Sequence, residues 1–184
     1  MRREPEATGI TLAPRERLLA LTVLNVACGN TDAHAKNFSF MLPGLSGAFE
    51  PRGRVATLAD AYDIVPQVLF DHEAALLSMR IGGKRFWREI TAEHLIDEGI
   101  GWGLPRARVA WVVEETLRRV QGAVAELAES SGAVSGDTDG DTLTGVDRLV
   151  RFLTEVTSNL LRGDPAWAGR SIPPAIAITG VRGQ

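Results

Sequence analysis

The sequence has a single cysteine, Cys28, so no disulfide can form within the chain. Cys28 lies in an apolar helical stretch, where a lone thiol is more often a small core residue than a nucleophile. No apolar run approaches the ~20 residues that a membrane span needs, and no apolar signal-peptide core follows the charged N-terminus. We therefore expect a soluble, cytoplasmic protein that does not contact membranes.

Excess charge and metal-binding patterns are also missing. The formal net charge is −3, which argues against a dedicated nucleic-acid binder. His72 and His94 show no zinc-ligand spacing with each other or with Cys28. The Gly-Gly-Lys tripeptide at 82–84 lacks the Gly-x-x-x-x-Gly-Lys-Ser/Thr frame of a phosphate-binding loop. We expect no direct nucleic-acid binding and no zinc site, and we interpret the tripeptide as a hairpin turn.

The apolar residues that are present predict one core. They make up 45% of the sequence, which is enough for one domain or one lobe of a larger one. Their spacing predicts helices over 15–28, 91–98, 105–129 and 144–162. Short strand-like runs predict hairpins over 38–59 and 74–87. The expected fold is mainly α with short β-hairpins (α+β), with a lead-in over 1–13, one lobe over 14–163 and a tail over 164–184.

Polar side chains gather in the short stretch between the first helix and the first strand, Gly-Asn-Thr-Asp-Ala-His-Ala-Lys-Asn at 29–37. Asp32, His34, Lys36 and Asn37 cannot share one helix face or one strand face, so they indicate an irregular loop that converges on a ligand. Phosphoryl transfer needs a carboxylate that orients a hydroxyl, an amide oxygen that helps to hold Mg²⁺, and cationic groups against phosphate oxygens. We therefore hypothesise that Asp32 is a catalytic base and Asn37 a magnesium ligand.

A second acidic segment follows the first predicted hairpin. The hairpin returns the chain so that Asp60 and Asp63 are expected near the loop that holds Asp32 and Asn37. Carboxylates and an amide from two segments can share a hard cation through their oxygen atoms. For Asp60, a helix cap, a solvent-exposed charge and a secondary ligand all remain open.

Three stretches together carry a family resemblance: Gly-Asn-Thr-Asp-Ala-His-Ala-Lys-Asn-Phe-Ser at 29–39, Leu-Ala-Asp-Ala-Tyr-Asp-Ile-Val-Pro at 58–66 and Leu-Ser-Met-Arg-Ile-Gly-Gly-Lys at 77–84. They resemble the C-terminal lobe of HipA-like serine/threonine kinases, the toxins of bacterial toxin–antitoxin pairs. The resemblance implies a protein-kinase-like lobe that uses ATP and Mg²⁺. It implies Asp32 as the base that accepts the substrate hydroxyl proton, with Asn37 and Asp63 as magnesium ligands. It further implies that the nucleotide phosphates are lined by His34, Ala35, Lys36, Asn37 and Tyr62.

The same resemblance implies a function in bacterial persistence. A serine/threonine protein kinase of this family would transfer the ATP γ-phosphate to a protein hydroxyl, with an aminoacyl-tRNA synthetase as substrate and a small helix-turn-helix antitoxin as partner. The Asp-x-His-x-x-Asn spacing is also similar to that of phosphoinositide-type kinases, so the loop alone does not choose between protein and lipid substrates. His34 either contacts phosphate or orients the loop, and Lys36 either contacts the transferring phosphate or neutralises the acidic cluster.

One part of a complete kinase is missing from the pattern. No glycine-rich loop and no strand lysine precede the helix that starts at Arg15, so nothing in the sequence is expected to cover the nucleotide. An alternative is therefore a truncated or split, non-catalytic lobe that acts only with a separate N-terminal kinase lobe. A third hypothesis is a metal-dependent phosphohydrolase that uses the same carboxylates and amide.

Overall fold

The computed structural model describes residues 12–41, 57–70, 75–131 and 145–169. Its helices are α1 (Pro14–Ala27), α2 (Ala92–Gly101), α3 (Arg106–Ser131) and α4 (Gly145–Arg162). Its strands are β1 (Phe40–Met41), β2 (Thr57–Leu58), β3 (Leu76–Ile81) and β4 (Lys84–Phe86), and its 3₁₀ turns are η1 (Ala35–Asn37), η2 (Gln67–Leu69) and η3 (Trp87–Glu89). The predicted α+β fold class is confirmed, and each predicted helix is found within about three residues of its expected ends.

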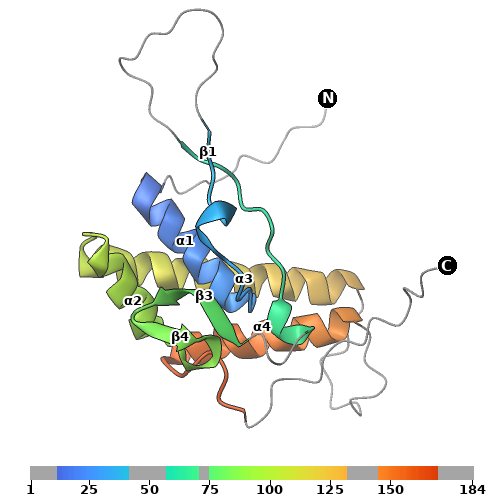
Figure 1. The fold of residues 1–184 in the computed structure, drawn as a ribbon. Helices are drawn as coiled ribbons and strands as arrows, with labels where there is room; N and C mark the ends of the chain where they lie inside the picture. Colours follow the sequence, from blue (N-terminus) through green and yellow to red (C-terminus); the bar gives the residue numbers. More distant parts are fainter. Residues whose placement is uncertain (1–11, 42–56, 71–74, 132–144, 170–184) are drawn as a thin grey trace, which may run out of the picture.

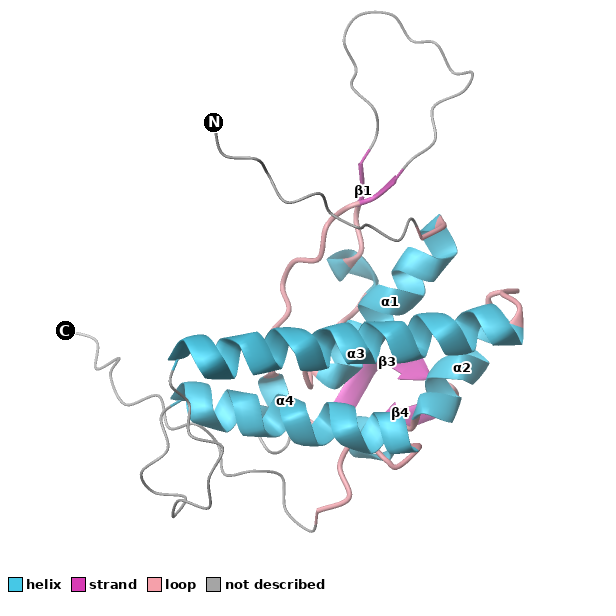
Figure 2. Cartoon of the chain, turned by 180° about the vertical axis from the view of Figure 1, so that it is seen from behind, coloured by secondary structure: helices cyan, strands magenta, loops and turns pink. Residues whose placement is uncertain are grey.

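The described elements form two layers. Helices α3 and α4 pack against each other, and α3 also packs against α1 and α2. Figure 1 shows α1 and the β3–β4 hairpin on one side of the α3–α4 pair, and Figure 2 shows the same pair from behind. The loop that follows α1 begins against Phe152 of α4 at Gly29 and continues beside β3, where the Ser78 N–H bonds to the Thr31 carbonyl. Among the described residues, no helix combines the length and the apolar character needed to cross a bilayer.

Helix α1 is packed in the core and anchors the loop that follows it. Pro14 opens it, and the Glu16 carboxylate accepts a hydrogen bond from the Ala13 backbone N–H at 2.9 Å, which satisfies one of the free amides of the first turn. Leu19 and Val23 are completely buried. Because α1 is packed on its inner face, the polar loop at its C-terminal end starts from a fixed point.

Aromatic packing joins the hairpin layer to α4. Trp87 and Phe152 stack with ring centroids 5.7 Å apart, and the Trp87 indole N–H donates to the Val26 carbonyl oxygen at 2.7 Å. The start of the predicted tail also packs here, since Ala166 is completely buried and its N–H donates to the Ile90 carbonyl at 2.7 Å. The division at 164 stays a prediction, and residues 170–184 lie outside the described residues.

Both hairpins are antiparallel. Strand β1 pairs with β2 (Phe40 with Leu58), and β3 pairs with β4 (Ile81 with Lys84). Gly82 and Gly83 form the turn between β3 and β4, as predicted. The predicted turn between β1 and β2 and the first half of the second strand fall in 42–56, outside the described residues.

Cys28 belongs to the core. It packs against the buried apolar cluster, and burial raises the pKa of its thiol to about 11. The thiol therefore stays protonated at neutral pH, which agrees with the prediction that Cys28 is not a nucleophile.

Candidate active site

The loop leaves α1 through a turn that only glycine fits. Gly29 has φ +68°, and a Cβ atom there would clash with Val68 and lie 2.8 Å from the Phe152 ring. The residues that follow, Asn30 and Thr31, are each 3% exposed. The Thr31 hydroxyl donates to the Gln67 side-chain oxygen at 2.9 Å. The base of the loop is therefore held inside the protein, although the polar side chains beyond it reach the surface.

The β1–β2 hairpin brings the two predicted magnesium ligands into contact. The Asn37 Nδ2 donates to the Asp63 Oδ2 at 2.6 Å, although the residues are 26 positions apart. The Asn37 Oδ1 accepts the backbone N–H of His34 at 3.0 Å, which fixes the side chain against its own loop. The proximity predicted from the hairpin is observed, and the role of each residue stays a prediction.

Asp63 has a backbone conformation that is uncommon for residues other than glycine. Its φ is +57°, and it is the only non-glycine residue with a positive φ in the described part of the chain. A side chain in this region typically costs about 1–3 kcal/mol and persists where the surroundings enforce it, often at functional sites. The Asp63 carbonyl oxygen accepts a hydrogen bond from the Asn30 side chain at 2.9 Å. The buried Asn30 side chain therefore bonds directly to the peptide group of the residue with the positive φ.

The predicted base, Asp32, is exposed beside strand β3. The Ser78 hydroxyl donates to the Asp32 Oδ1 at 3.3 Å, and the Ser78 N–H donates to the Thr31 carbonyl at 2.8 Å. These two bonds tie β3 to the loop next to the carboxylate. Ser78 was not identified as a site residue from the sequence, because no local pattern connects it with a residue 46 positions earlier.

The other residues predicted to line the nucleotide phosphates lie in this loop or, in the case of Tyr62, against it. The Tyr62 hydroxyl donates to the Lys36 carbonyl at 2.7 Å and lies 2.7 Å from the Ser39 hydroxyl, so it also anchors the loop backbone. The side chains of Ala35 and Lys36 are exposed. The Nδ1 of His34 is buried without a hydrogen-bond partner among the described residues. An unpaired buried nitrogen in a polar loop is unfavourable unless a further group completes the site.

Asp60 does not join this pair. Its side chain is 99% exposed and forms an ion pair with Arg17 of α1. Of the three roles left open for Asp60, the structure supports a solvent-exposed charge.

The chemistry of the donor atoms suits magnesium. Among the described residues, no group of three or more His, Cys, Asp and Glu side chains is placed to hold a metal ion. Mg²⁺ does not need such a cage, because it usually binds one or two carboxylates and completes its shell with waters and phosphate oxygens. Asp63 offers a carboxylate, and the Asn37 Oδ1 keeps a second lone pair beside its bond to His34. The oxygen atoms of both residues are of the kind that Mg²⁺ binds in the presence of phosphate, and the Asn37 atom that faces Asp63 in this structure is the amide nitrogen.

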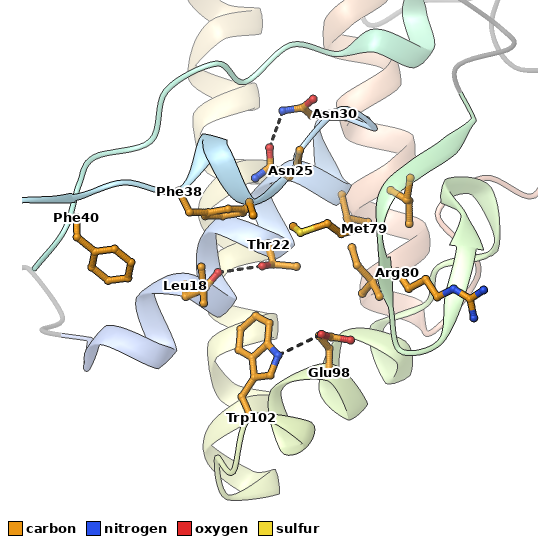
Figure 3. A pocket seen from close by; sticks show the side chains of 15 residues that line it. Leu18, Thr22, Asn25, Asn30, Phe38, Phe40, Met79, Arg80, Glu98 and Trp102 are labelled. Atoms are coloured by element: carbon orange, nitrogen blue, oxygen red, sulfur yellow. Dashed lines mark hydrogen bonds between the residues drawn. The ribbon is translucent and has the colours of Figure 1, made fainter.

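A largely apolar pocket of about 390 Å³ adjoins the loop on its other side (Figure 3). Its walls come from α1, the loop, β3 and α2. Phe40 and Met79 line it, and their side chains are 58% and 38% exposed. The Glu98 carboxylate also lines it and is held by the Gly82 N–H at 2.8 Å and the Trp102 indole N–H at 3.1 Å.

Comparison with known proteins gives one family. The family model of HipA-like C-terminal domains matches residues 6–124. The serine/threonine-protein kinase toxin HipA of Shewanella oneidensis is 29% identical over 152 residues, which cover 79% of this chain and 33% of the toxin. The protein Y4mE of Sinorhizobium fredii is 28% identical over 145 residues, which cover 74% of this chain and 31% of Y4mE.

The structural comparison agrees. A chain from the solved complex of Shewanella oneidensis HipA, HipB and operator DNA matches with a TM-score of 0.53 and 26% identity, over 80% of this chain and 30% of that chain. This chain therefore spans about a third of the length of the relatives that it matches.

Proposed function

Because the chain belongs to the family of HipA-like C-terminal domains, we propose that it carries the phosphoryl-transfer centre of a serine/threonine protein kinase that acts as the toxin of a toxin–antitoxin pair. The observation that carries the proposal is the 2.6 Å hydrogen bond between Asn37, which lies in the same loop as Asp32, and Asp63 of a second segment. The two segments bring an amide and a carboxylate side by side, and Asp32 adds an exposed carboxylate; phosphoryl transfer uses groups of these kinds.

In the proposed reaction Asp32 acts as the base. Its exposed carboxylate accepts the proton of a serine or threonine hydroxyl as that oxygen forms a bond to the γ-phosphorus of ATP. The bond between the γ-phosphorus and the bridging oxygen breaks, and ADP leaves with the bridging oxygen. When bound, MgATP supplies the phosphoryl group, and its cation neutralises phosphate charge. Asn37 and Asp63 hold the cation, and Ser78 orients the Asp32 carboxylate through its hydroxyl.

The rest of the loop is assigned to the phosphates. Lys36 is exposed and cationic, and its side chain can reach a phosphate oxygen placed over the loop. His34 is assigned to the same group, because its buried Nδ1 has no partner among the described residues. Ala35 leaves room for the phosphates, and Tyr62 shapes the loop through its bond to the Lys36 carbonyl.

The relatives suggest partners for this function. The similar solved chain comes from a complex of HipA with HipB and operator DNA. We extend the antitoxin interaction to this chain and assign it a small helix-turn-helix protein as partner. A protein substrate with an accessible hydroxyl, such as an aminoacyl-tRNA synthetase, and a cytoplasmic location complete the proposal.

The deciding experiment measures phosphate transfer from radiolabelled ATP to protein acceptors for the wild type, Asp32→Asn and Asp60→Asn. Both substitutions remove one exposed carboxylate near the loop, but only Asp32 is assigned to the chemistry. We expect Asp32→Asn to lose transfer by about 10²–10⁴-fold, which is the usual contribution of a general base. Asp60→Asn should transfer at the wild-type rate. Full turnover by Asp32→Asn would exclude the assigned base.

A second candidate is a lobe that is active only with a separate N-terminal kinase lobe. The exposed apolar side chains at the pocket beside the loop favour it, because such patches often mark protein contacts. The chain also spans only about a third of its relatives. Calorimetric titration of a non-hydrolysable ATP analogue with Mg²⁺ separates the candidates. Micromolar binding, about −8 kcal/mol, means that this lobe holds nucleotide alone. A folded chain that binds none supports the need for a second lobe.

A further inference from the structure

Two buried asparagines connect helix α1 with the Asp63 peptide. Asn25 is 5% exposed and Asn30 is 3% exposed. The Asn25 Nδ2 donates to the Leu21 carbonyl oxygen at 2.8 Å. Figure 3 shows the next bond, in which the Asn25 Oδ1 accepts from the Asn30 Nδ2 at 2.7 Å. The Asn30 Nδ2 also donates to the Asp63 carbonyl oxygen at 2.9 Å. The hydrogen bonds therefore run without a break from a packed helix to the predicted metal ligand.

Asn30 uses its donors in a specific way. Its amide nitrogen has two hydrogens, and its two hydrogen bonds direct one to Asn25 and the other to Asp63. The Asn25 bond fixes the Asn30 side chain, and the Asp63 bond then acts on a peptide whose φ is +57°. Buried hydrogen bonds of this kind are costly to break, because the partner left behind stays away from water.

The backbone conformation of Asp63 decides where its carboxylate points. In the observed conformation the carboxylate lies against Asn37 at 2.6 Å. A return of Asp63 to an ordinary negative φ would change the direction of the Cα–Cβ bond and break this contact. Whatever holds the Asp63 peptide therefore also holds the geometry of the ligand pair.

We propose that Asn30 is a positioning residue for metal binding. It holds Asp63 in the left-handed conformation, and Asn25 holds Asn30. The proposal rests on the magnesium role assigned to Asp63 above. It gives a function to two asparagines that were not among the site residues predicted from the sequence.

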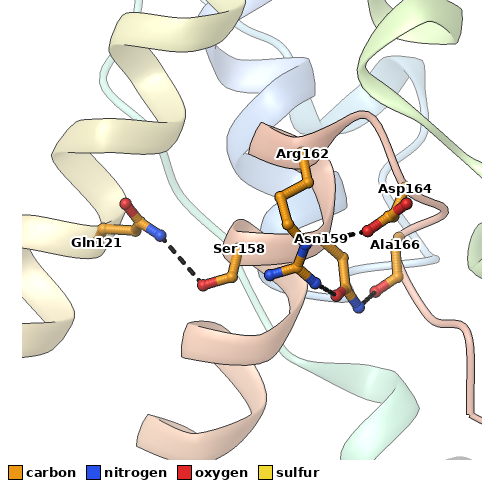
Figure 4. Close-up of polar contacts among 6 residues, drawn as sticks. All are labelled: Gln121, Ser158, Asn159, Arg162, Asp164 and Ala166. Atoms are coloured by element: carbon orange, nitrogen blue, oxygen red, sulfur yellow. Dashed lines mark hydrogen bonds and ion pairs between the residues drawn. The ribbon is translucent and has the colours of Figure 1, made fainter.

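The test compares two buried asparagines. Asn159 in α4 is 6% exposed, and it also donates to a backbone carbonyl, that of Ala166 at 3.4 Å, and accepts from the Arg162 side chain (Figure 4). Asn159→Ala therefore removes a similar buried amide that has no hydrogen bond to the loop among those of the described residues. The variants Asn30→Ala, Asn159→Ala and Asp63→Ala are titrated with Mn²⁺ in the presence of a non-hydrolysable ATP analogue, and free Mn²⁺ is followed by electron paramagnetic resonance. Circular dichroism checks that each variant is folded at the temperature of the titration.

We expect Asn30→Ala to weaken Mn²⁺ binding by about 10–100-fold, as is usual when a partner that orients a metal ligand is removed. Asn159→Ala should bind Mn²⁺ like the wild type, although it also loses stability. If Asn30→Ala does not fold, Asn30→Ser takes its place, because its shorter hydroxyl cannot span the distance to the Asp63 carbonyl.

The outcomes separate the inference from the function on which it rests. Wild-type affinity in Asn30→Ala, together with a loss in Asp63→Ala, overturns the positioning role and leaves the metal role intact. An equal loss in Asn30→Ala and Asn159→Ala also overturns it, since general destabilisation then explains both. Unchanged binding in Asp63→Ala overturns the metal role and the inference together, and no binding by the folded wild type overturns both for this chain on its own.

Discussion

A single methyl group at Gly29 should destabilise the whole lobe. An L-residue at φ +68° costs about 1–2 kcal/mol, because its Cβ atom crowds the following carbonyl. The added Cβ atom would also clash with Val68 and lie 2.8 Å from the Phe152 ring. Both neighbours are buried, and overpacking of this kind typically costs a further 1–3 kcal/mol, roughly. We therefore expect Gly29→Ala to lower the free energy of unfolding by about 2–5 kcal/mol, measured by urea denaturation.

Gly83→Ala provides the matched control. Gly83 has φ +79°, but a Cβ atom there would have no neighbour within 4 Å. The conformational cost and the change in unfolded-chain entropy apply to both substitutions, so they largely cancel in the comparison. Gly29→Ala should be less stable than Gly83→Ala by about 1–3 kcal/mol, which is the packing cost alone. Equal stability of the two variants would refute the close packing of Val68 and Phe152 on the turn.

Two further predictions concern titratable groups. Because burial raises the pKa of Cys28 from 9.0 to about 11, its thiol should react with a disulfide reagent about a hundredfold more slowly in the folded protein than in urea. Equal rates in the folded protein and in urea would show that the Cys28 thiol is exposed to solvent. The hydrogen bond from Arg108, aided by the Ala13 N–H, lowers the pKa of Glu16 below its usual 4.5. The resulting stabilisation is present above pH 4.5 and is lost as the pH falls through the lowered value, so the melting temperature of Glu16→Gln should depend less on pH in that range.

The helices could be predicted because their signals are local. The three- and four-residue spacing of apolar side chains in α3 and α4 requires only that one face be buried, whereas the apolar residues of α1 nearly encircle it and mark it as buried. Pro14 and Gly29 marked the ends of α1, since proline suits the first turn and glycine the left-handed position after the last. The polar stretch from Asp32 to Asn37 stood out because no regular element accommodates it.

The site was harder to predict than the helices, because its contacts join residues that are far apart in the sequence. The hairpin pattern was enough to predict that Asp63 lies near Asn37, and the structure places them in contact. Nothing in the sequence connected Ser78 with Asp32, because 46 residues separate them. Asn25 had a signal that could have been used, since it is an amide within an otherwise apolar helical run.

The sequence by itself determined which segments become helices, where the polar loop interrupts them and which side chains the loop displays. Those properties follow from the periodicity of burial and from the chemistry of neighbouring residues. Only the tertiary structure decided the left-handed backbone of Asp63, its hydrogen bond from Asn30 and the ion pair that takes Asp60 away from the ligand pair. Those features depend on how separate elements pack, because a strained peptide is stable only where distant groups hold it.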